Sequence, residues 1–367
     1  MSVLWSLEPA TAAKHELYKR YLDAWWPIML QPSRSGRLWP RITYLDAFAG
    51  PGRYTGGQEG SPVFALSRLL NHVAAGRMQL SRNRVRLVFM EKHRRRYQHL
   101  LGELTGRFGP LGELPVRVEV RNGEAGADAG AVLGELGAWG HPLLAVFDSW
   151  GNVNVPLSLI ERVARNKASE VIVTFAPNWF SRRQDLDAAR LDAVFGGRAH
   201  WAAAAREDRP EERWRAWLAV YRDALRRAGF SYQLQFRVVP RTGQPLYLVY
   251  GTGNPKGLEV MKEAMWDVDV NEGIGFQDPR TRGAELPGQQ TLWAGVGTAH
   301  PELAELARQR LAGGPVTVGE LGQWLLTQTA RWRARDASQA VRDLQHSGLV
   351  SVHPDGRLTG KSVIRLA

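Results

Sequence analysis

Short apolar runs alternate with segments of helical periodicity along the first half of the chain. The apolar runs predict strands over residues 42–48, 85–90, 116–120, 142–147 and 171–175. The periodic segments predict a first helix over residues 11–30 and, between the strands, helices over residues 62–75, 92–107, 126–136 and 157–166. Strands that alternate with helices predict an α/β fold with a mainly parallel, doubly wound sheet.

Two further strands are predicted after this alternation. A periodic segment at residues 211–228 predicts a helix, and apolar runs follow it at residues 232–239 and 246–251. The turn between the two runs contains Arg241-Thr242-Gly243, so they predict a hairpin that adds an antiparallel pair at one edge of the sheet. The prediction is therefore a seven-stranded, Rossmann-like sheet, and five parallel strands followed by a hairpin are the layout of class I methyltransferases.

The C-terminal part of the chain follows a different pattern. Residues 271–300 are rich in Gly and Pro and lack periodicity, which predicts a linker between a first domain, residues 1–270, and a second, residues 301–367. The second domain is expected to hold two helices and then a hairpin that turns at Pro354-Asp355-Gly356. These elements are predicted over residues 318–329, 337–347, 349–353 and 363–366. Two helices followed by a hairpin predict a winged helix-turn-helix domain.

Composition adds a charge bias to this picture. The 367 residues include 48 Lys and Arg against 36 Asp and Glu, a formal net charge of +12. Such a surplus favours a polyanionic partner, usually nucleic acid, although a GC-rich genome would also enrich a protein in Arg, Gly and Ala. The sequence has no Cys, which excludes disulfides, thiolate zinc sites and iron–sulfur clusters.

The sequence carries no signal for a membrane, for secretion or for a metal. No apolar run approaches the roughly 20 residues that span a bilayer, and the N-terminus has no signal-peptide pattern. We therefore expect a cytoplasmic protein with no membrane partner. The nine His are scattered, and no spacing of His, Asp and Glu suits a metal ion, so no catalytic metal is expected.

The sharpest chemical signal is the turn after the first predicted strand. It reads Asp-x-Phe-x-Gly-x-Gly, with Asp46, Phe48, Gly50 and Gly52 at the marked positions. The two glycines let the backbone approach a ligand closely. In a methyltransferase this turn holds the amino-acid end of S-adenosylmethionine, and Asp46 would accept hydrogen bonds from the ammonium group. A Gly-x-Gly-x-x-Gly fingerprint is not present here, and no Walker lysine follows.

Polar residues also end the next three predicted strands, where parallel strands line a ligand crevice. Glu91 could accept both ribose hydroxyls of a cofactor, or could be a carboxylate that favours a helix N-terminus. Asn122 or Glu124 could reach the exocyclic amine of adenine, or could belong to an ordinary Asn-Gly turn. Asp148 could accept a proton or hydrogen bond from the substrate nucleophile, with a helix cap as the alternative. Trp150 could stack on a base, or could be a core aromatic.

Together these residues resemble the three-Cys-motif partner protein family, a group of predicted class I methyltransferases. The resemblance covers roughly residues 10–270. It runs through Lys14-His15-Glu16, residues 46–54, Gly60-Ser61-Pro62, Glu91, residues 148–151 and residues 257–266. The resemblance implies a genomic partner protein that carries the three cysteines.

Part of the pattern is also similar to the bacterial 23S rRNA adenine-N6 methyltransferases. This similarity implies that Lys14 and Ser61 lie at the cofactor, with Lys14 as the cation for its carboxylate. The sequence departs from that pattern after the fourth strand, where Asp148-Ser149-Trp150-Gly151 replaces the Asp/Asn-Pro-Pro-aromatic motif that grips the target amine. Adenine-N6 chemistry is therefore not predicted.

Basic residues in two places favour nucleic-acid contact. Arg182 and Arg183 follow the fifth strand beside Trp179 and Phe180, a mixture that suits a substrate groove. The C-terminal domain carries Arg331, Arg333, Arg335, Arg342, Arg357, Lys361 and Arg365. In a winged helix the second helix enters a groove and the hairpin contacts phosphate, although many winged helices dock on proteins instead.

The sequence thus predicts an S-adenosylmethionine-dependent methyltransferase that acts on a base of RNA or DNA. The main alternative is a catalytically inactive protein with the same two domains that binds nucleic acid or a partner, because the Asp-Ser-Trp-Gly segment is altered. A dinucleotide-dependent oxidoreductase is a third hypothesis, which the spacing of the glycine turn disfavours.

Overall fold

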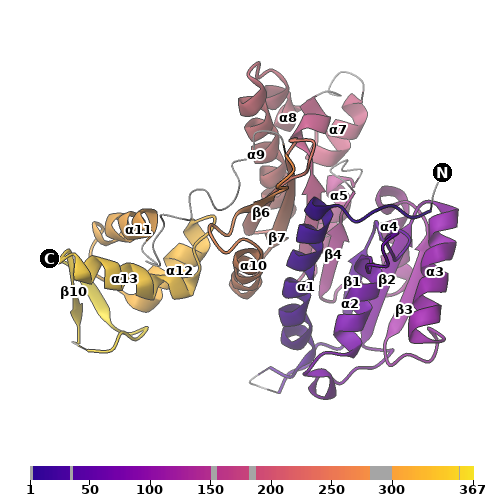
Figure 1. The fold of residues 1–367 in the computed structure, drawn as a ribbon, viewed down its shortest axis with the longest axis horizontal. Helices are drawn as coiled ribbons and strands as arrows, with labels where there is room; N and C mark the ends of the chain where they lie inside the picture. Colours follow the sequence, from indigo (N-terminus) through magenta and orange to yellow (C-terminus); the bar gives the residue numbers. More distant parts are fainter. Residues whose placement is uncertain (1–2, 34–35, 150–154, 182–186, 282–299, 355) are drawn as a thin grey trace.

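A large mixed sheet is the main feature of the computed structural model, which describes residues 3–33, 36–149, 155–181, 187–281, 300–354 and 356–367 (Figure 1). Its eight strands lie in the order β3-β2-β1-β4-β5-β7-β6-β8. They are β1 (Ile42–Asp46), β2 (Val85–Glu91), β3 (Arg117–Asn122), β4 (Leu143–Phe147), β5 (Glu170–Phe175), β6 (Tyr232–Val239), β7 (Leu246–Thr252) and β8 (Gly275–Gln277). Strands β1 to β5 are parallel, and β7 is antiparallel to both of its neighbours. The predicted doubly wound α/β sheet with a terminal hairpin is confirmed.

The prediction of seven strands is wrong because of β8. This strand pairs in parallel with β6 at the outer edge of the sheet, inside the segment predicted to be a linker. The carboxylate of Asp269 prepares the pairing, since it accepts hydrogen bonds from the backbone amides of Ile274 and Gly275 at 3.0 and 3.2 Å. A three-residue strand is too short to show an alternating pattern, so periodicity could not reveal it. Residues 282–299 of the predicted linker lie outside the described residues.

Helices cover both faces of the sheet. One face is covered by α1 (Pro9–Leu30), α2 (Ser61–Leu70), α3 (Arg94–Phe108) and α10 (Pro255–Val268). The other face is covered by α4 (Ala125–Glu135), α5 (Leu157–Ala164), α6 (Pro177–Ser181), α7 (Ala188–Phe195), α8 (Arg198–Ala205) and α9 (Pro210–Ala228). A short 3-10 helix, η1, spans Ala75–Arg77. Among the described residues, no helix has both the length and the apolar character that crossing a membrane would need.

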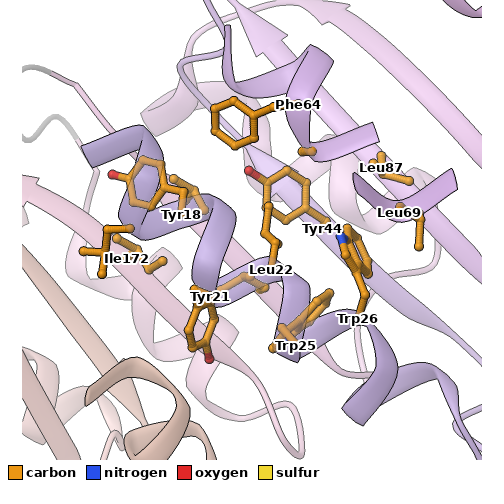
Figure 2. Packing of buried hydrophobic residues seen from close by; sticks show 14 of the residues in the cluster. Tyr18, Tyr21, Leu22, Trp25, Trp26, Tyr44, Phe64, Leu69, Leu87 and Ile172 are labelled. Carbon is orange, nitrogen blue, oxygen red and sulfur yellow. The ribbon is translucent and has the colours of Figure 1, made fainter. Parts of the chain in front are cut away.

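Helix α1 carries an aromatic stripe into the first face (Figure 2). Tyr18, Tyr21 and Trp25 recur every three or four positions and are almost completely buried. Pro9 stands in the first turn, where its missing N–H removes no helical hydrogen bond. The packing of this stripe fixes the helix across the sheet, and it brings Lys14 to the carboxyl end of β4.

A C-terminal unit has its own small core beside this sheet (Figure 1). It consists of α11 (Pro301–Leu311), β9 (Val316–Thr317), α12 (Val318–Gln328), the 3-10 helix η2 (Ala334–Asp336), α13 (Ala337–His346), β10 (Val350–His353) and β11 (Val363–Leu366). The three strands form an antiparallel sheet in the order β10-β11-β9. The two predicted helices and the hairpin are present, whereas α11 and β9 were not predicted.

A buried lysine joins this unit to the large sheet domain. Lys262 of α10 is fully buried, and its Nζ donates hydrogen bonds of 2.7 Å to the carbonyl oxygens of Leu326, Thr329 and Trp332. A longer bond of 3.3 Å reaches the carbonyl of Leu325. The last carbonyls of a helix have no partner within the helix, so Lys262 closes the C-terminal end of α12. Burial lowers the pKa of Lys262 to about 7.

Candidate active site

The candidate site lies where the parallel strands end. Asp46 is the last residue of β1, Glu91 is the last residue of β2, and Asp148 directly follows β4. Since β1 lies between β2 and β4, the three acids come to one edge of the sheet. Two adjoining hollows of about 460 and 760 Å³ open at this edge and share part of their walls.

Most of the predicted site residues meet at these hollows. The smaller hollow is lined by Lys14, Phe48, Gly50, Gly52, Ser61 and Asp148, and the larger one by Phe48, Gly50, Glu91, Glu124 and Asp148, among others. Asp46, which is 1% exposed, lines neither of them, and neither does Asn122. Its side-chain amide donates to the backbone carbonyls of Glu91 and Lys92 at 2.8 and 2.9 Å, so it shapes the turn between β2 and α3.

The carboxylate of Asp46 is buried and only half satisfied. Its Oδ1 accepts a hydrogen bond of 3.2 Å from the amide of Phe48, while Oδ2 is buried with no hydrogen-bond partner among the described residues. Burial raises the pKa of Asp46 to about 7, against the opposing effects of the Ser61 hydroxyl and the Phe48 amide. A desolvated carboxylate oxygen of this kind favours a cationic N–H donor.

Glu91 offers a second unpaired acceptor. The side chain is 6% exposed, and its Oε1 accepts a hydrogen bond of 2.7 Å from the amide of His93. No residue in the described part of the chain donates to its other oxygen, which leaves that oxygen for a ligand on the wall of the larger hollow. Glu124, on the same wall, forms an ion pair of 3.0 Å with Lys92 and is more exposed.

The glycine turn is held tightly against the start of α2. Gly50 and Gly52 have φ values of +65° and +85°, which L residues with a Cβ seldom adopt. The amide of Gly60 donates to the carbonyl of Gly52 at 2.8 Å. A Cβ on Gly60 would lie 2.8 Å from the Gly52 carbonyl carbon, so this close approach requires glycine. The turn thereby presents its backbone, together with Ser61, to the smaller hollow.

Asp148 is held by three donors rather than left open to a substrate. Lys14 Nζ lies 2.7 and 2.8 Å from its two oxygens, the Tyr18 hydroxyl donates at 3.1 Å, and the Thr174 hydroxyl donates at 2.5 Å. Burial alone would raise the pKa of Asp148, but the Lys14 charge and the hydrogen bonds from Lys14 and Thr174 hold it below its ordinary value. The carboxylate is therefore ionised at neutral pH, and the ammonium predicted to meet a cofactor carboxylate is paired with it.

Three of the predicted site residues cannot be placed. Trp150, Arg182 and Arg183 lie outside the residues that the structure describes. Their predicted roles in base stacking and in a substrate groove remain predictions.

The sequence analysis did not identify Trp5, which lines both hollows. Its carbonyl accepts a hydrogen bond of 3.0 Å from the amide of Thr55, and its ring lies edge-on to Tyr54 with 6.1 Å between centroids. The guanidinium of Arg96 lies 4.8 Å from the centroid of the same ring. Trp5 precedes the first helix in a segment without periodicity, so nothing in the sequence pattern indicated its position.

The basic residues of the C-terminal unit fall into two groups. Arg331 lies over the ring of Trp332 at 4.2 Å, and Arg333 and Arg335 form ion pairs with Glu263 of α10 at 3.5 and 2.6 Å. These three arginines take part in packing around the joint between the units. Of these three, Arg335 is nonetheless exposed. The second group consists of the exposed residues that form no ion pair with a described residue, namely Arg342, Arg357, Lys361 and Arg365.

Comparisons with known proteins give similarity at the level of structure only. No family model matches the chain, and no curated protein matches it. Trm1 from Pyrococcus horikoshii, solved with S-adenosyl-L-methionine, is 12% identical with a TM-score of 0.36, over 70% of this chain and 60% of that one. Precorrin-6y C5,15-methyltransferase from Geobacter metallireducens is 12% identical with a TM-score of 0.31, over 63% of this chain and 87% of that one. The cyclopropane synthase MmaA2 from Mycobacterium tuberculosis is 12% identical with a TM-score of 0.31, over 70% and 69%.

Proposed function

We propose that this chain is an S-adenosylmethionine-dependent methyltransferase. The observation that carries the proposal is the pair of acids at the ends of the adjacent strands β1 and β2. Asp46 and Glu91 each keep one carboxylate oxygen without a hydrogen-bond partner among the described residues, next to the glycine turn. One buried acceptor without a partner and a second acceptor oxygen to which no described residue donates, at one edge of a doubly wound sheet, favour a ligand that brings its own donors.

The arrangement fits the chemical groups of S-adenosylmethionine. Asp46 would accept from the ammonium of its amino-acid end, and Glu91 would accept from the ribose hydroxyls. Gly50 lines both hollows and Gly52 lines the smaller one, so the glycine turn leaves the room that the amino-acid end needs. The sulfonium makes the methyl group electrophilic, so the protein mainly has to position donor and acceptor in line. The fixed, ionised Asp148 would orient the acceptor through its charge.

A titration calorimetry experiment tests this proposal. S-adenosylmethionine should bind the wild-type protein, and Asp46→Asn and Glu91→Gln should each weaken binding by at least about tenfold, the equivalent of about 1.4 kcal/mol for one lost hydrogen bond to a charged group. Glu113→Gln removes an exposed glutamate away from the hollows and should leave binding unchanged. Absence of binding to the wild-type protein would refute the proposal.

We propose nucleic acid, RNA or DNA, as the substrate, and a winged helix as the fold of the C-terminal unit. The net charge of +12 and the exposed cations of α13 and the hairpin support this choice. Transfer of a tritium-labelled methyl group to an RNA pool or to a DNA pool would identify the substrate. A protein that carries three cysteines, as the family resemblance implies, is a further proposed partner.

One observation favours a second candidate, a binding protein without catalytic activity. Both oxygens of Asp148 are already engaged by side chains of the protein, so this carboxylate has little capacity left to accept a proton from a substrate. Binding of S-adenosylmethionine without methyl transfer to either pool would support this candidate. Measured turnover would exclude it.

A further inference from the structure

A buried arginine for which the described residues provide no partner lies at the opposite end of the sheet from the hollows. Arg86 is the second residue of β2, whereas Glu91, on the wall of the larger hollow, is its last. Arg86 is 6% exposed, and its Nε and Nη1 are buried. Neither nitrogen donates a hydrogen bond to any described residue, and the guanidinium forms no ion pair with them. A charged group in this position needs an acceptor that the described part of the chain does not supply.

Arg84, two residues earlier, shows how this protein satisfies a buried guanidinium. Its Nε donates to the carbonyl of Trp39 at 2.8 Å, Nη1 to that of Met78 at 2.7 Å and Nη2 to that of Leu30 at 2.8 Å. Arg84 is 8% exposed, so the two arginines are buried to nearly the same degree. They differ in their acceptors and not in their burial.

The groups around Arg86 are basic. Arg117 is its direct neighbour across the β2–β3 ladder, Arg41 immediately precedes β1, and His141 lies just before β4 (Figure 1). Burial and the charges of Arg41 and Arg117 lower the pKa of Arg86 to about 10, so it remains a cation at neutral pH. His141 precedes Pro142, whose carbonyl accepts a hydrogen bond from the amide of Thr43, the direct neighbour of Arg86 on β1. Burial and the charges of Arg41 and Arg86 lower the pKa of His141.

The neighbouring groups also keep donors free for an anion. Arg41 donates from Nη1 to the carbonyl of Gly137 at 2.5 Å, but its Nε is buried with no partner in the described residues. Arg117 is paired with Glu119 at 2.8 Å, which is the acid nearest to the cluster by ion-pair contact. Three guanidinium groups against one carboxylate leave a positive charge that no other acid in the described part of the chain balances by an ion pair.

An unpaired charge in a protein interior costs several kcal/mol, because burial removes its hydration without a replacement. Repulsion among three guanidinium groups adds to that cost. A bound tetrahedral oxyanion removes both costs. Its oxygens accept hydrogen bonds from the planar guanidinium groups, and its negative charge offsets the positive charge of the cluster. Phosphate is the oxyanion of this shape that proteins meet most often.

We propose that Arg41, Arg86, Arg117 and His141 form a binding site for a phosphate group at the amino ends of β1, β2 and β3. This site is separate from the proposed methyltransferase site at the carboxyl ends of the same strands, and it does not depend on that proposal. The phosphate group comes either from free inorganic phosphate or from the backbone of a nucleic acid.

Thermal unfolding of the full-length protein tests the site. Inorganic phosphate should raise the midpoint of unfolding in a saturable way, beyond the effect of sodium chloride at equal ionic strength. Arg86→Met should abolish this rise and weaken phosphate binding, measured by calorimetry, by at least tenfold. In the absence of phosphate the variant should be no less stable than the wild type, because the substitution removes an unsatisfied charge.

Arg84→Met is the matched control. It removes four hydrogen bonds to backbone carbonyls, so its midpoint should fall with and without phosphate, while the phosphate-dependent rise is retained. If Arg84→Met does not fold, Arg82→Met, which changes an exposed arginine just before β2, serves in its place. The proposal is overturned if wild-type protein gains no more from phosphate than from chloride, or if Arg86→Met keeps the rise.

A short single-stranded oligonucleotide distinguishes the two sources of the phosphate group. Competition between the oligonucleotide and inorganic phosphate, together with weaker oligonucleotide binding by Arg86→Met, would identify a nucleic-acid backbone as the ligand. Phosphate binding that the oligonucleotide leaves unchanged would identify the free ion.

Discussion

At Asp46, burial destabilises the ionised carboxylate that the proposed function needs. The pKa of this group is about 7 in the folded protein, against 3.8 for an unperturbed Asp. Between these two values the folded state binds more protons than the unfolded state. The free energy of unfolding contributed by Asp46 therefore decreases as the pH rises from about 4 to about 7, and the full cost is present above that range.

Asp46→Asn should consequently stabilise the protein at pH 8 and have little effect near pH 4. A pKa shift of this size corresponds to a change in the free energy of unfolding on the order of 2–4 kcal/mol. Urea unfolding at the two pH values measures the difference. Asp208→Asn, which changes an exposed side chain, should show no such dependence on pH. A loss of stability in Asp46→Asn at pH 8 would contradict the assigned role of burial.

Single residues also show where sequence reasoning reaches its limit. Asp46, Glu91 and Asp148 could be placed at one crevice because apolar runs define where parallel strands end. The pairing of Lys14 with Asp148 could not be predicted, because 134 residues separate them and their contact depends on how α1 packs across the sheet. The position of Trp5 at the hollows could not be predicted either, because it also depends on how distant segments of the chain pack.

Among the elements, α10 was missed although its start carries clear signals. Asn254 accepts a hydrogen bond of 2.9 Å from the amide of Lys256, and Pro255 stands in the first turn. The Gly and Pro residues at the start of α10 also indicate a turn, because the helix directly follows two predicted strands. They therefore obscured the helix signals. The strands β1 to β7 were predicted within a few residues. Four of them, β1, β2, β4 and β5, are buried along their whole length and give nearly continuous apolar runs.

The contact between α10 and the end of α12 is made by the side chain of Lys262. Lys262→Met should leave the four carbonyls at the end of α12 without their donor, at a cost of about 1–3 kcal/mol. Amide hydrogen exchange in residues 325–332 should then be faster in the variant than in the wild type, and this increase should exceed any change in the large sheet. Lys256→Met changes an exposed lysine of the same helix, which pairs with Glu259, and should be nearly neutral. Unchanged exchange in Lys262→Met would show that the joint does not rely on this lysine.

At the scale of the whole molecule, some of the Lys and Arg residues that give the net positive charge take part in packing, and others are exposed and available for binding. Arg331, Arg333 and Arg335 contact aromatic rings or acids near the joint, so composition overestimates how many cations the C-terminal unit offers to a ligand. Arg342 and Lys361 are exposed on α13 and before β11, respectively. Sequence alone could count these residues but could not separate the two groups, because contacts with aromatic rings and acids distant in the sequence decide between them.

The double substitution Arg342→Gln and Lys361→Gln should weaken nucleic-acid binding at low salt. If each side chain neutralises one phosphate, the slope of log affinity against log salt should fall by about 2. Arg198→Gln with Arg206→Gln removes the same charge from exposed positions around α8 and controls for net charge. An equal loss in both double variants would indicate general electrostatic attraction and not contact by the C-terminal unit.

The order of strands in the large sheet has a consequence for self-association. β3 is the end strand on one side, and Arg117, Glu119 and Arg121 alternate along it. Charges on an edge strand oppose the addition of a strand from another molecule. At the other side the sheet ends in β8, whose three residues offer a very short ladder. Both open edges are thus poor templates for edge-to-edge aggregation, and neutral β-branched residues at the three charged positions of β3 would remove that protection at high protein concentration.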